Sequence, residues 1–184
     1  MIHLDTERLA RVRRSRDLET PEWSRLVQLC EQYLAVPLPY GGHEQNFALA
    51  GFISGDMRFK NKAIQLALAR CAKGYPELNT HGYGSWGGVR ETVPAVACVF
   101  NWLHETLLPS QRTTMATWLV NWGNLCWPET QPAGMRQNYG RDHPGDNFYA
   151  GFTYACFAAG LTLIERGELE EFAGNRLLDI AYRR

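Results

Sequence analysis

Lysine is scarce in this chain of 184 residues, and neither sign of charge is in excess. It occurs only as Lys60, Lys62 and Lys73, so arginine supplies most of the 19 basic side chains, and 19 acidic side chains balance them. A net charge of zero excludes the strong global field that draws a protein to nucleic acid or to an anionic membrane. Attraction for a charged ligand must therefore come from local groups.

The cysteines lack the arrangement of a disulfide framework or a zinc site. Their number is odd, they are spread evenly, and no C-x-x-C pair occurs among them. Each lies in an apolar helical pattern, so we expect buried, reduced thiols. The five positions are Cys30, Cys71, Cys98, Cys126 and Cys156.

Targeting signals and membrane spans are also lacking. The first residues do not show the basic-then-apolar pattern of a signal peptide. No apolar run approaches the roughly 18 uninterrupted residues that a membrane span needs. We expect a soluble protein, which would be periplasmic or secreted only if a signal had been trimmed.

Strand signals are weak, whereas helical periodicity runs through the chain. Sustained period-two alternation is absent and β-branched residues are sparse. With 45% hydrophobic residues, the chain can bury one sizeable core. We predict a single all-α domain over residues 1–184, built from antiparallel helical hairpins.

Apolar spacing and end signals predict the individual helices. Apolar stripes or runs mark seven segments, and we expect two longer loops at 74–88 and 128–146. His104 and Glu105 follow the most regular stripe, so we expect both to face solvent. The predicted helical segments are 21–34, 47–53, 63–73, 89–107, 110–126, 148–164 and 168–182.

Four motifs resemble heparinase II/III and alginate lyase-type proteins. They are Pro21-Glu22-Trp23 with Tyr33-Leu34, the Gly55-Asp56-Met57-Arg58 turn, Phe100-Asn101-Trp102-Leu103 with Leu108-Pro109-Ser110, and His143-Pro144-Gly145-Asp146-Asn147 before an apolar helix. The resemblance covers residues 4–166. It implies an incomplete (α/α) toroid, of which this chain would be the N-terminal part. It also implies a cleft for acidic polysaccharides, which are cleaved by β-elimination.

The resemblance implies three catalytic candidates. Elimination from a uronic acid needs a group that neutralises the carboxylate, a base for the neighbouring proton and an acid for the departing sugar oxygen. Asn147 matches the asparagine of the active-site turn. The next position is Phe148 rather than the histidine common in the family, so His143 is the candidate base. Tyr149 could donate to the leaving oxygen, and no metal or other cofactor is required.

Five further residues are candidates for binding an acidic polysaccharide or oligosaccharide. Arg141 suits bidentate contact with a uronate carboxylate. Exposed aromatic rings suit stacking on the apolar faces of sugar rings. The other four candidates are Asn138, Tyr139, Tyr83 and Trp86, the last two in a glycine-rich segment.

Two alternatives remain open at this stage. A toroid-type glycoside hydrolase would need two carboxylates facing each other across a cleft, and Glu91, Asp142 and Asp146 are available. A non-catalytic carbohydrate-binding or structural helical fragment is the other alternative, because the lyase family usually takes a tyrosine from a later hairpin.

Overall fold

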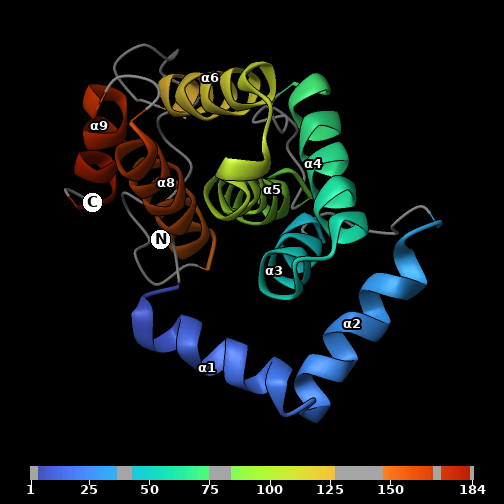
Figure 1. Ribbon diagram of the computed structural model, residues 1–184. Helices are drawn as coiled ribbons and strands as arrows, with labels where there is room; N and C mark the ends of the chain where they lie inside the picture. The colour runs from blue at the N-terminus through green and yellow to red at the C-terminus, as the bar shows by residue number, and fades with distance from the viewer. Residues whose placement is uncertain (1–3, 37–42, 75–83, 127–146, 168–170, 183–184) are drawn as a thin grey trace.

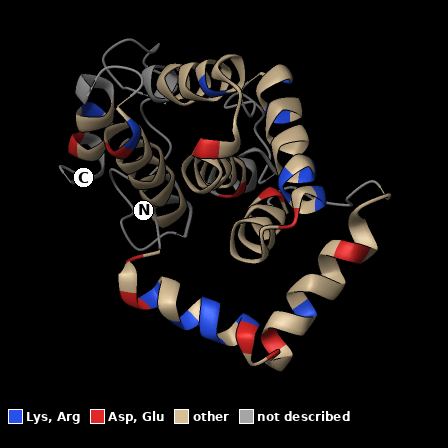
Figure 2. Cartoon of the chain, viewed as in Figure 1, with Lys and Arg blue, Asp and Glu red and all other residues tan. Residues whose placement is uncertain are grey.

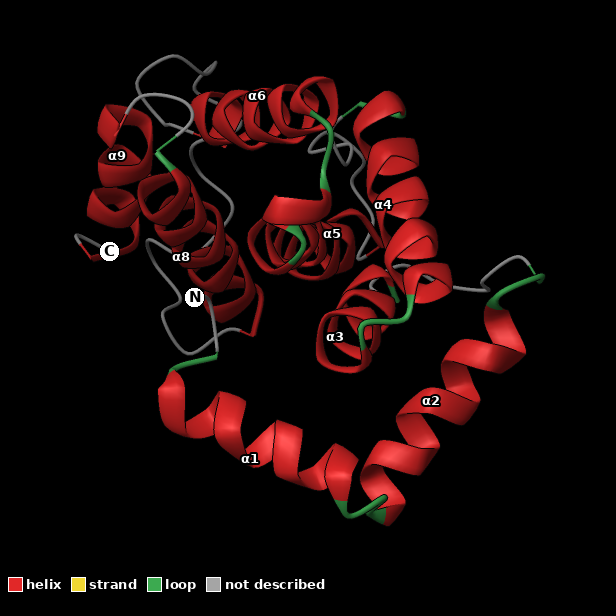
Figure 3. Cartoon of the chain, in the orientation of Figure 1, coloured by secondary structure: helices red, strands yellow, loops and turns green. Residues whose placement is uncertain are grey.

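Every regular element that the structure describes is a helix (Figures 1 and 3). The structure is a computed structural model, and it describes residues 4–36, 43–74, 84–126, 147–167 and 171–182. The helices are α1 (Thr6–Asp17), α2 (Pro21–Tyr33), α3 (Glu44–Ser54), α4 (Met57–Ala72), α5 (Gly84–Trp102), the 3₁₀ helix η1 (His104–Thr106), α6 (Pro109–Cys126), α8 (Asn147–Arg166) and α9 (Glu171–Tyr182). The all-α prediction is confirmed for these ranges.

Side-chain caps explain where the N-terminal helices begin. The Asp5 carboxylate accepts a hydrogen bond from the Arg8 amide at 2.8 Å at the start of α1. Thr20 caps α2, and Pro21 occupies the first helical position, where its missing N–H costs nothing. These short polar residues satisfy amide groups that have no partner inside the helix.

Three consecutive hairpins pack in two layers. α3 with α4, α5 with α6, and α8 with α9 each form a pair. Helices α3, α5 and α8 contact one another in chain order, and α4, α6 and α9 do the same on the other side. In Figure 1, α5 is seen end-on near the centre between α4 and α8, with α6 above it and α9 beyond α8. We call α3, α5 and α8 the inner helices.

Helix α5 is the centre of the core. It contacts α3, α4, α6 and α8, and every residue from Thr92 to His104 is buried. Three tryptophans are buried as well, namely Trp102, Trp118 and Trp122. Burial on all sides explains why the stripe in this segment is broad, because each face of the helix meets another helix.

Helix α5 begins earlier than the sequence predicts. Residues 84–88 belong to the helix rather than to the expected loop at 74–88. Glycine at three of these five positions disfavours a helix locally. Packing of the rest of α5 against four neighbouring helices offsets that local cost.

Helices α8 and α9 cross where two glycines meet. A Cβ atom built on Gly160 would lie 2.9 Å from the carbonyl oxygen of Gly174. A Cβ atom on Gly174 would lie 2.7 Å from Cγ1 of Ile164. The absence of side chains at both glycines therefore permits the close approach of these helices.

Helix α1 lies at the edge of the molecule, against α2 and α3 (Figure 1). It has no buried residue, and its arginines lie along the helix between Glu7 in the first turn and Asp17 at the end (Figure 2). The exception is Arg16, which donates from Nη1 to the carbonyl oxygen of Ile53 at 2.5 Å. Among the described helices, none has the length and hydropathy required to cross a membrane.

Candidate functional site

The inner helices α5 and α8 run in the same general direction, and their C-terminal parts are joined by hydrogen bonds. Thr162 Oγ1 donates to the carbonyl oxygen of Ala97 at 3.5 Å. One turn further along both helices, Asn101 Nδ2 donates to Glu165 Oε2 at 2.8 Å. The residue numbers of the bonded pairs increase in the same direction along both helices. Helices α5 and α8 therefore begin on one side of the molecule and end on the other.

A buried polar cluster closes the side where α5 and α8 end. Arg166 donates to the carbonyl oxygen of Asn101, which is 0% exposed, and lies 3.7 Å from a Glu105 carboxylate oxygen. His104 packs edge-on against the Phe100 ring, with centroids 5.3 Å apart. His104 is buried, so the expectation that it faces solvent is wrong, whereas Glu105 is exposed as expected. The 3₁₀ turn folds the His104 ring back onto α5, and the cluster therefore has a structural role.

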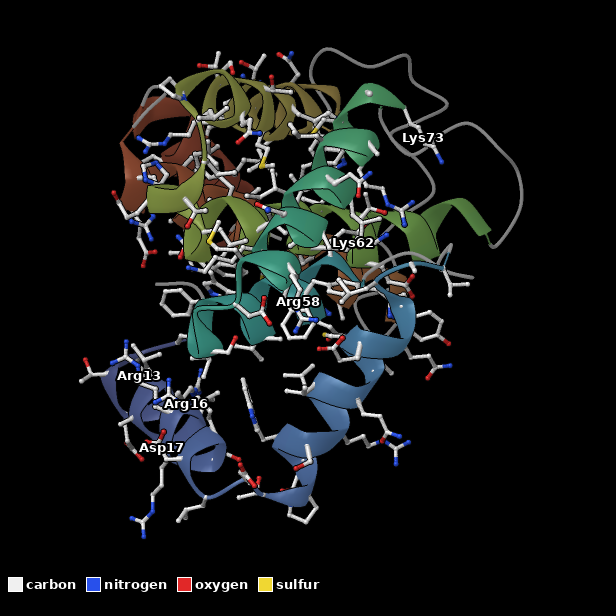
Figure 4. All side chains as sticks on the ribbon, turned by 45° about the vertical axis from the view of Figure 1, so that its right-hand side comes forward. Arg13, Arg16, Asp17, Arg58, Lys62 and Lys73 are labelled. Carbon is white, nitrogen blue, oxygen red and sulfur yellow. The ribbon has the colours of Figure 1, made fainter. Side chains whose placement is uncertain are left out.

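The opposite side of the molecule holds the starts of the inner helices. In Figure 4, Lys73 at the end of α4 lies on the same side as the beginning of α5. Arg70, in the last turn of α4, pairs with Glu44 at the start of α3, with Nε and Oε1 2.7 Å apart. Trp118 of α6 donates from Nε1 to the carbonyl oxygen of Gly74, also at the end of α4, at 3.1 Å. We call the starts of α3, α5 and α8 together with the end of α4 the N-terminal rim.

Three predicted site residues belong to helices that begin at this rim. Asn147 is the first residue of α8, Tyr149 is the third, and Trp86 is the third residue of α5. Their backbones are described but their side chains are not. The start of a helix offers free backbone N–H groups and positive dipole to an anion, so this position of Asn147 suits a carboxylate ligand.

The other predicted site residues lie outside the described ranges. They are His143, Arg141, Tyr139, Asn138 and Tyr83. Of the carboxylates proposed for a hydrolase, Glu91 is exposed on α5, and Asp142 and Asp146 are outside the described ranges. In the described part of the chain, the helix starts that carry Trp86, Asn147 and Tyr149 thus lie on the same side of the molecule.

The same rim holds a buried carboxylate, that of Glu44, which is not among the site residues predicted from the sequence. Glu44 is 2% exposed, and only one of its carboxylate oxygens has a hydrogen-bond partner. Nδ1 of the adjacent His43 is also buried without a partner. Helical spacing contained a signal, since Glu44 precedes Phe47 by three positions and Gly51 by seven, and both of these are buried.

The Gly-Asp-x-Arg motif forms the turn between α3 and α4, away from the rim. Gly55 adopts a left-handed conformation with φ of 81° and ends α3. Asp56 caps α4 by accepting from the Arg58 amide at 2.8 Å. Arg58 Nη2 also contacts Asp56 and the Glu31 carboxylate of α2, each at 2.7 Å. These bonds, chiefly those from the Arg58 side chain, hold the pKa of Asp56 below its usual range.

Within the described ranges, no three His, Cys, Asp or Glu residues gather as potential metal ligands. Cys30, Cys71, Cys98 and Cys156 are free, and burial raises the pKa of the first three of these thiols to about 12. A thiol with such a pKa is a poor nucleophile. The polar side chains described at the N-terminal rim include the Glu44 carboxylate, the Arg70 guanidinium and the His43 imidazole.

Comparisons with protein-family models, with curated proteins and with solved structures give no match for this chain.

Proposed function

We propose that this chain is part of an (α/α) toroid that binds a uronate-containing polysaccharide and cleaves it by β-elimination. The observation that carries the proposal is the common direction of α5 and α8, given by the bonds from Thr162 to Ala97 and from Asn101 to Glu165. Because of this direction, Asn147 and Trp86 both belong to first turns on one side of the molecule. The stacking of three hairpins in two layers also agrees with a toroid.

In this proposal, three residues divide the chemistry. The Asn147 amide hydrogen-bonds the uronate carboxylate, which disperses the negative charge that develops when the neighbouring C–H bond breaks. His143 takes that proton as the base, since imidazole is largely neutral above about pH 6.5. Tyr149 gives a proton to the departing sugar oxygen as the C–O bond breaks and a C=C bond forms. Atoms and charges balance without an added reactant.

Sugar binding in this proposal uses the five binding residues predicted from the sequence. Trp86 and Tyr83 stack on sugar rings, and Arg141 pairs with a uronate carboxylate. Asn138 and Tyr139 supply further hydrogen bonds to hydroxyl groups. A neutral protein thus attracts an acidic polymer through a local site rather than through its overall field.

The test is incubation of the protein with alginate, heparin and hyaluronan while ultraviolet absorbance is followed, because each elimination creates a conjugated C=C bond. We expect absorbance to rise with at least one polymer, and Asn147→Ala to lower the rate by about 100-fold or more. The matched control is Asn61→Ala, which changes an exposed asparagine of α4 and should keep the wild-type rate. New reducing ends without absorbance would indicate hydrolysis instead, and no cleavage of any of these polymers would contradict the proposal.

A further inference from the structure

A buried carboxylate at the N-terminal rim has one oxygen without a hydrogen-bond partner. Glu44 is 2% exposed, and its Oε1 accepts from Arg70 Nε at 2.7 Å. Its Oε2 is buried and has no hydrogen-bond partner among the described residues. Buried carboxylate oxygens in folded proteins are nearly always hydrogen-bonded, because the lost hydration is otherwise not replaced. The unpaired Oε2 therefore points to a donor that a ligand would supply.

The groups around Glu44 also have unused hydrogen-bonding capacity. Arg70 is 31% exposed, and among the described residues its guanidinium is bonded only through Nε to Glu44. The two Nη groups remain available as a cationic fork for a planar anion. His43 Nδ1 is buried without a partner, and the Tyr33 ring lies 6.0 Å from the His43 ring at an interplanar angle of 38°.

We propose that the start of α3 is a subsite for a uronate sugar, in which Glu44 Oε2 and His43 Nδ1 bind hydroxyl groups and the Nη groups of Arg70 bind the carboxylate. The Tyr33 ring provides an apolar surface beside it. This inference rests on the proposed function, because it assigns a second part of the N-terminal rim to the same polymer.

The charges select this ligand class over others. A divalent cation would meet the Arg70 guanidinium beside a single carboxylate, and it prefers several oxygen ligands. A phosphate dianion carries two negative charges and would be repelled by the Glu44 carboxylate. A uronate carries hydroxyl donors and a carboxylate on one ring, which matches the acceptor of Glu44 and the donors of Arg70.

The test is calorimetric titration of the protein with tetrasaccharides prepared from alginate, heparin and hyaluronan. Mannotetraose is the neutral control, because it matches a mannuronate tetrasaccharide without its carboxylates. We expect at least one acidic tetrasaccharide to bind, and Glu44→Gln to weaken that binding by about tenfold or more. Glu31→Gln is the matched control, since Glu31 also pairs with an arginine but on an exposed surface. This control should bind as tightly as the wild type.

Two further measurements keep the result independent of folding defects. Arg70→Lys keeps a positive charge beside Glu44 but removes the two Nη groups. The variant should therefore bind the acidic tetrasaccharide more weakly than the wild type, whereas its titration with mannotetraose should match that of the wild type. In the wild type, NMR signals of the His43 ring, assigned with His43→Gln, should shift during the titration. Circular dichroism establishes that each variant is folded.

The two proposals fail in different ways. The subsite would be overturned if the wild type and Glu44→Gln bound the acidic tetrasaccharide equally tightly. It would also be overturned if no acidic tetrasaccharide both bound and shifted the NMR signals of the His43 ring. If Glu44→Gln catalysed elimination at the wild-type rate, the subsite would be overturned and the proposed function would stand. Glu44-dependent binding without any elimination would support the subsite and remove only the catalytic part of the proposed function.

Discussion

Single residues in this molecule differ most from expectation where a charged or ionisable side chain is covered by another helix. Glu44 is the first residue of α3 and His104 the first residue of η1. Side chains at helix termini usually reach water. Glu44 is covered because Arg70 returns to it from α4, and His104 because a 3₁₀ turn directs it onto Phe100. Neither contact follows from local periodicity, since both depend on how one segment folds back onto another.

At the residue scale, Asp56 provides a pH-dependent contribution to stability. The hydrogen bonds from Arg58 lower the pKa of Asp56 in the folded protein below the usual value of about 3.9. The folded state therefore binds this proton less readily than the unfolded state. The stabilisation is present above about pH 4 and is lost as the pH falls through the lower, folded-state pKa.

We predict that Arg58→Ala raises the pKa of Asp56 towards its usual value, measured by NMR titration of the carboxyl carbon. The rise should be partial, because the Arg58 amide also bonds to Asp56 and remains in the variant. Arg25→Ala, an exposed change on α2, should leave the titration of Asp56 unaltered. An unchanged pKa in Arg58→Ala would show that the side-chain contact has no effect in solution.

At the scale of elements, most helices could be predicted from the sequence because their end signals are local. Thr20 with Pro21 marks the start of α2, and Gly167, with φ of 62°, follows the last turn of α8. The early start of α5 could not be predicted, because glycines at 84, 87 and 88 indicate a loop. Packing of the rest of α5 against its neighbours offsets the cost of these glycines. This packing between helices cannot be read from the local sequence pattern.

The crossing of α8 and α9 gives a prediction for these elements. Gly174→Ala would place a Cβ atom 2.7 Å from Ile164 Cγ1 and 2.9 Å from the carbonyl oxygen of Gly160. The helices must separate, so we expect a loss of about 1–2 kcal/mol in the free energy of unfolding, despite the better helix propensity of alanine. Urea unfolding followed by tryptophan fluorescence measures this loss.

The adjacent, exposed Asn175 supplies the control. Asn175→Ala should keep or slightly raise stability, because alanine favours a helix and no neighbour is close. Gly160→Ala should destabilise in the same way, and the double variant should lose less than the sum, since both changes act on one contact. A Gly174→Ala protein as stable as the wild type would contradict the close approach.

At the scale of the whole molecule, buried thiols report global unfolding. Cys98 of α5 and Cys156 of α8 are both buried in the central core. In a protein whose other cysteines are replaced, we predict that Cys98 reacts with a disulfide reagent at pH 8 only when the entire core opens. The free energy from labelling in urea should then equal that from fluorescence.

Cys71 is the comparison site, because it is only partly buried at the edge of the core. A protein with Cys71 alone should be labelled faster than one with Cys98 alone, through local opening of the end of α4. Fast labelling of Cys98 without urea would mean that α5 is not the centre of a stable core.

At this scale the candidate site was predicted less completely than the fold. The start of a helix beside Asn147 is visible in the sequence, whereas the sequence predicts a loop for Trp86, which lies in a helix only because α5 begins at Gly84. The direction of α5 relative to α8 is not visible, because it depends on bonds between Asn101 and Glu165, 64 positions apart. The Glu44 subsite depends on such a distant pairing as well.

The stacking of hairpins has a consequence for synthesis on the ribosome. The pair α3 and α4 contacts chiefly α5 and α6, and these in turn contact α8 and α9. Each hairpin therefore finds most of its partners in the segment made just before it. Such a chain can fold from its N-terminus as it emerges, each new hairpin docking on a surface that is already formed.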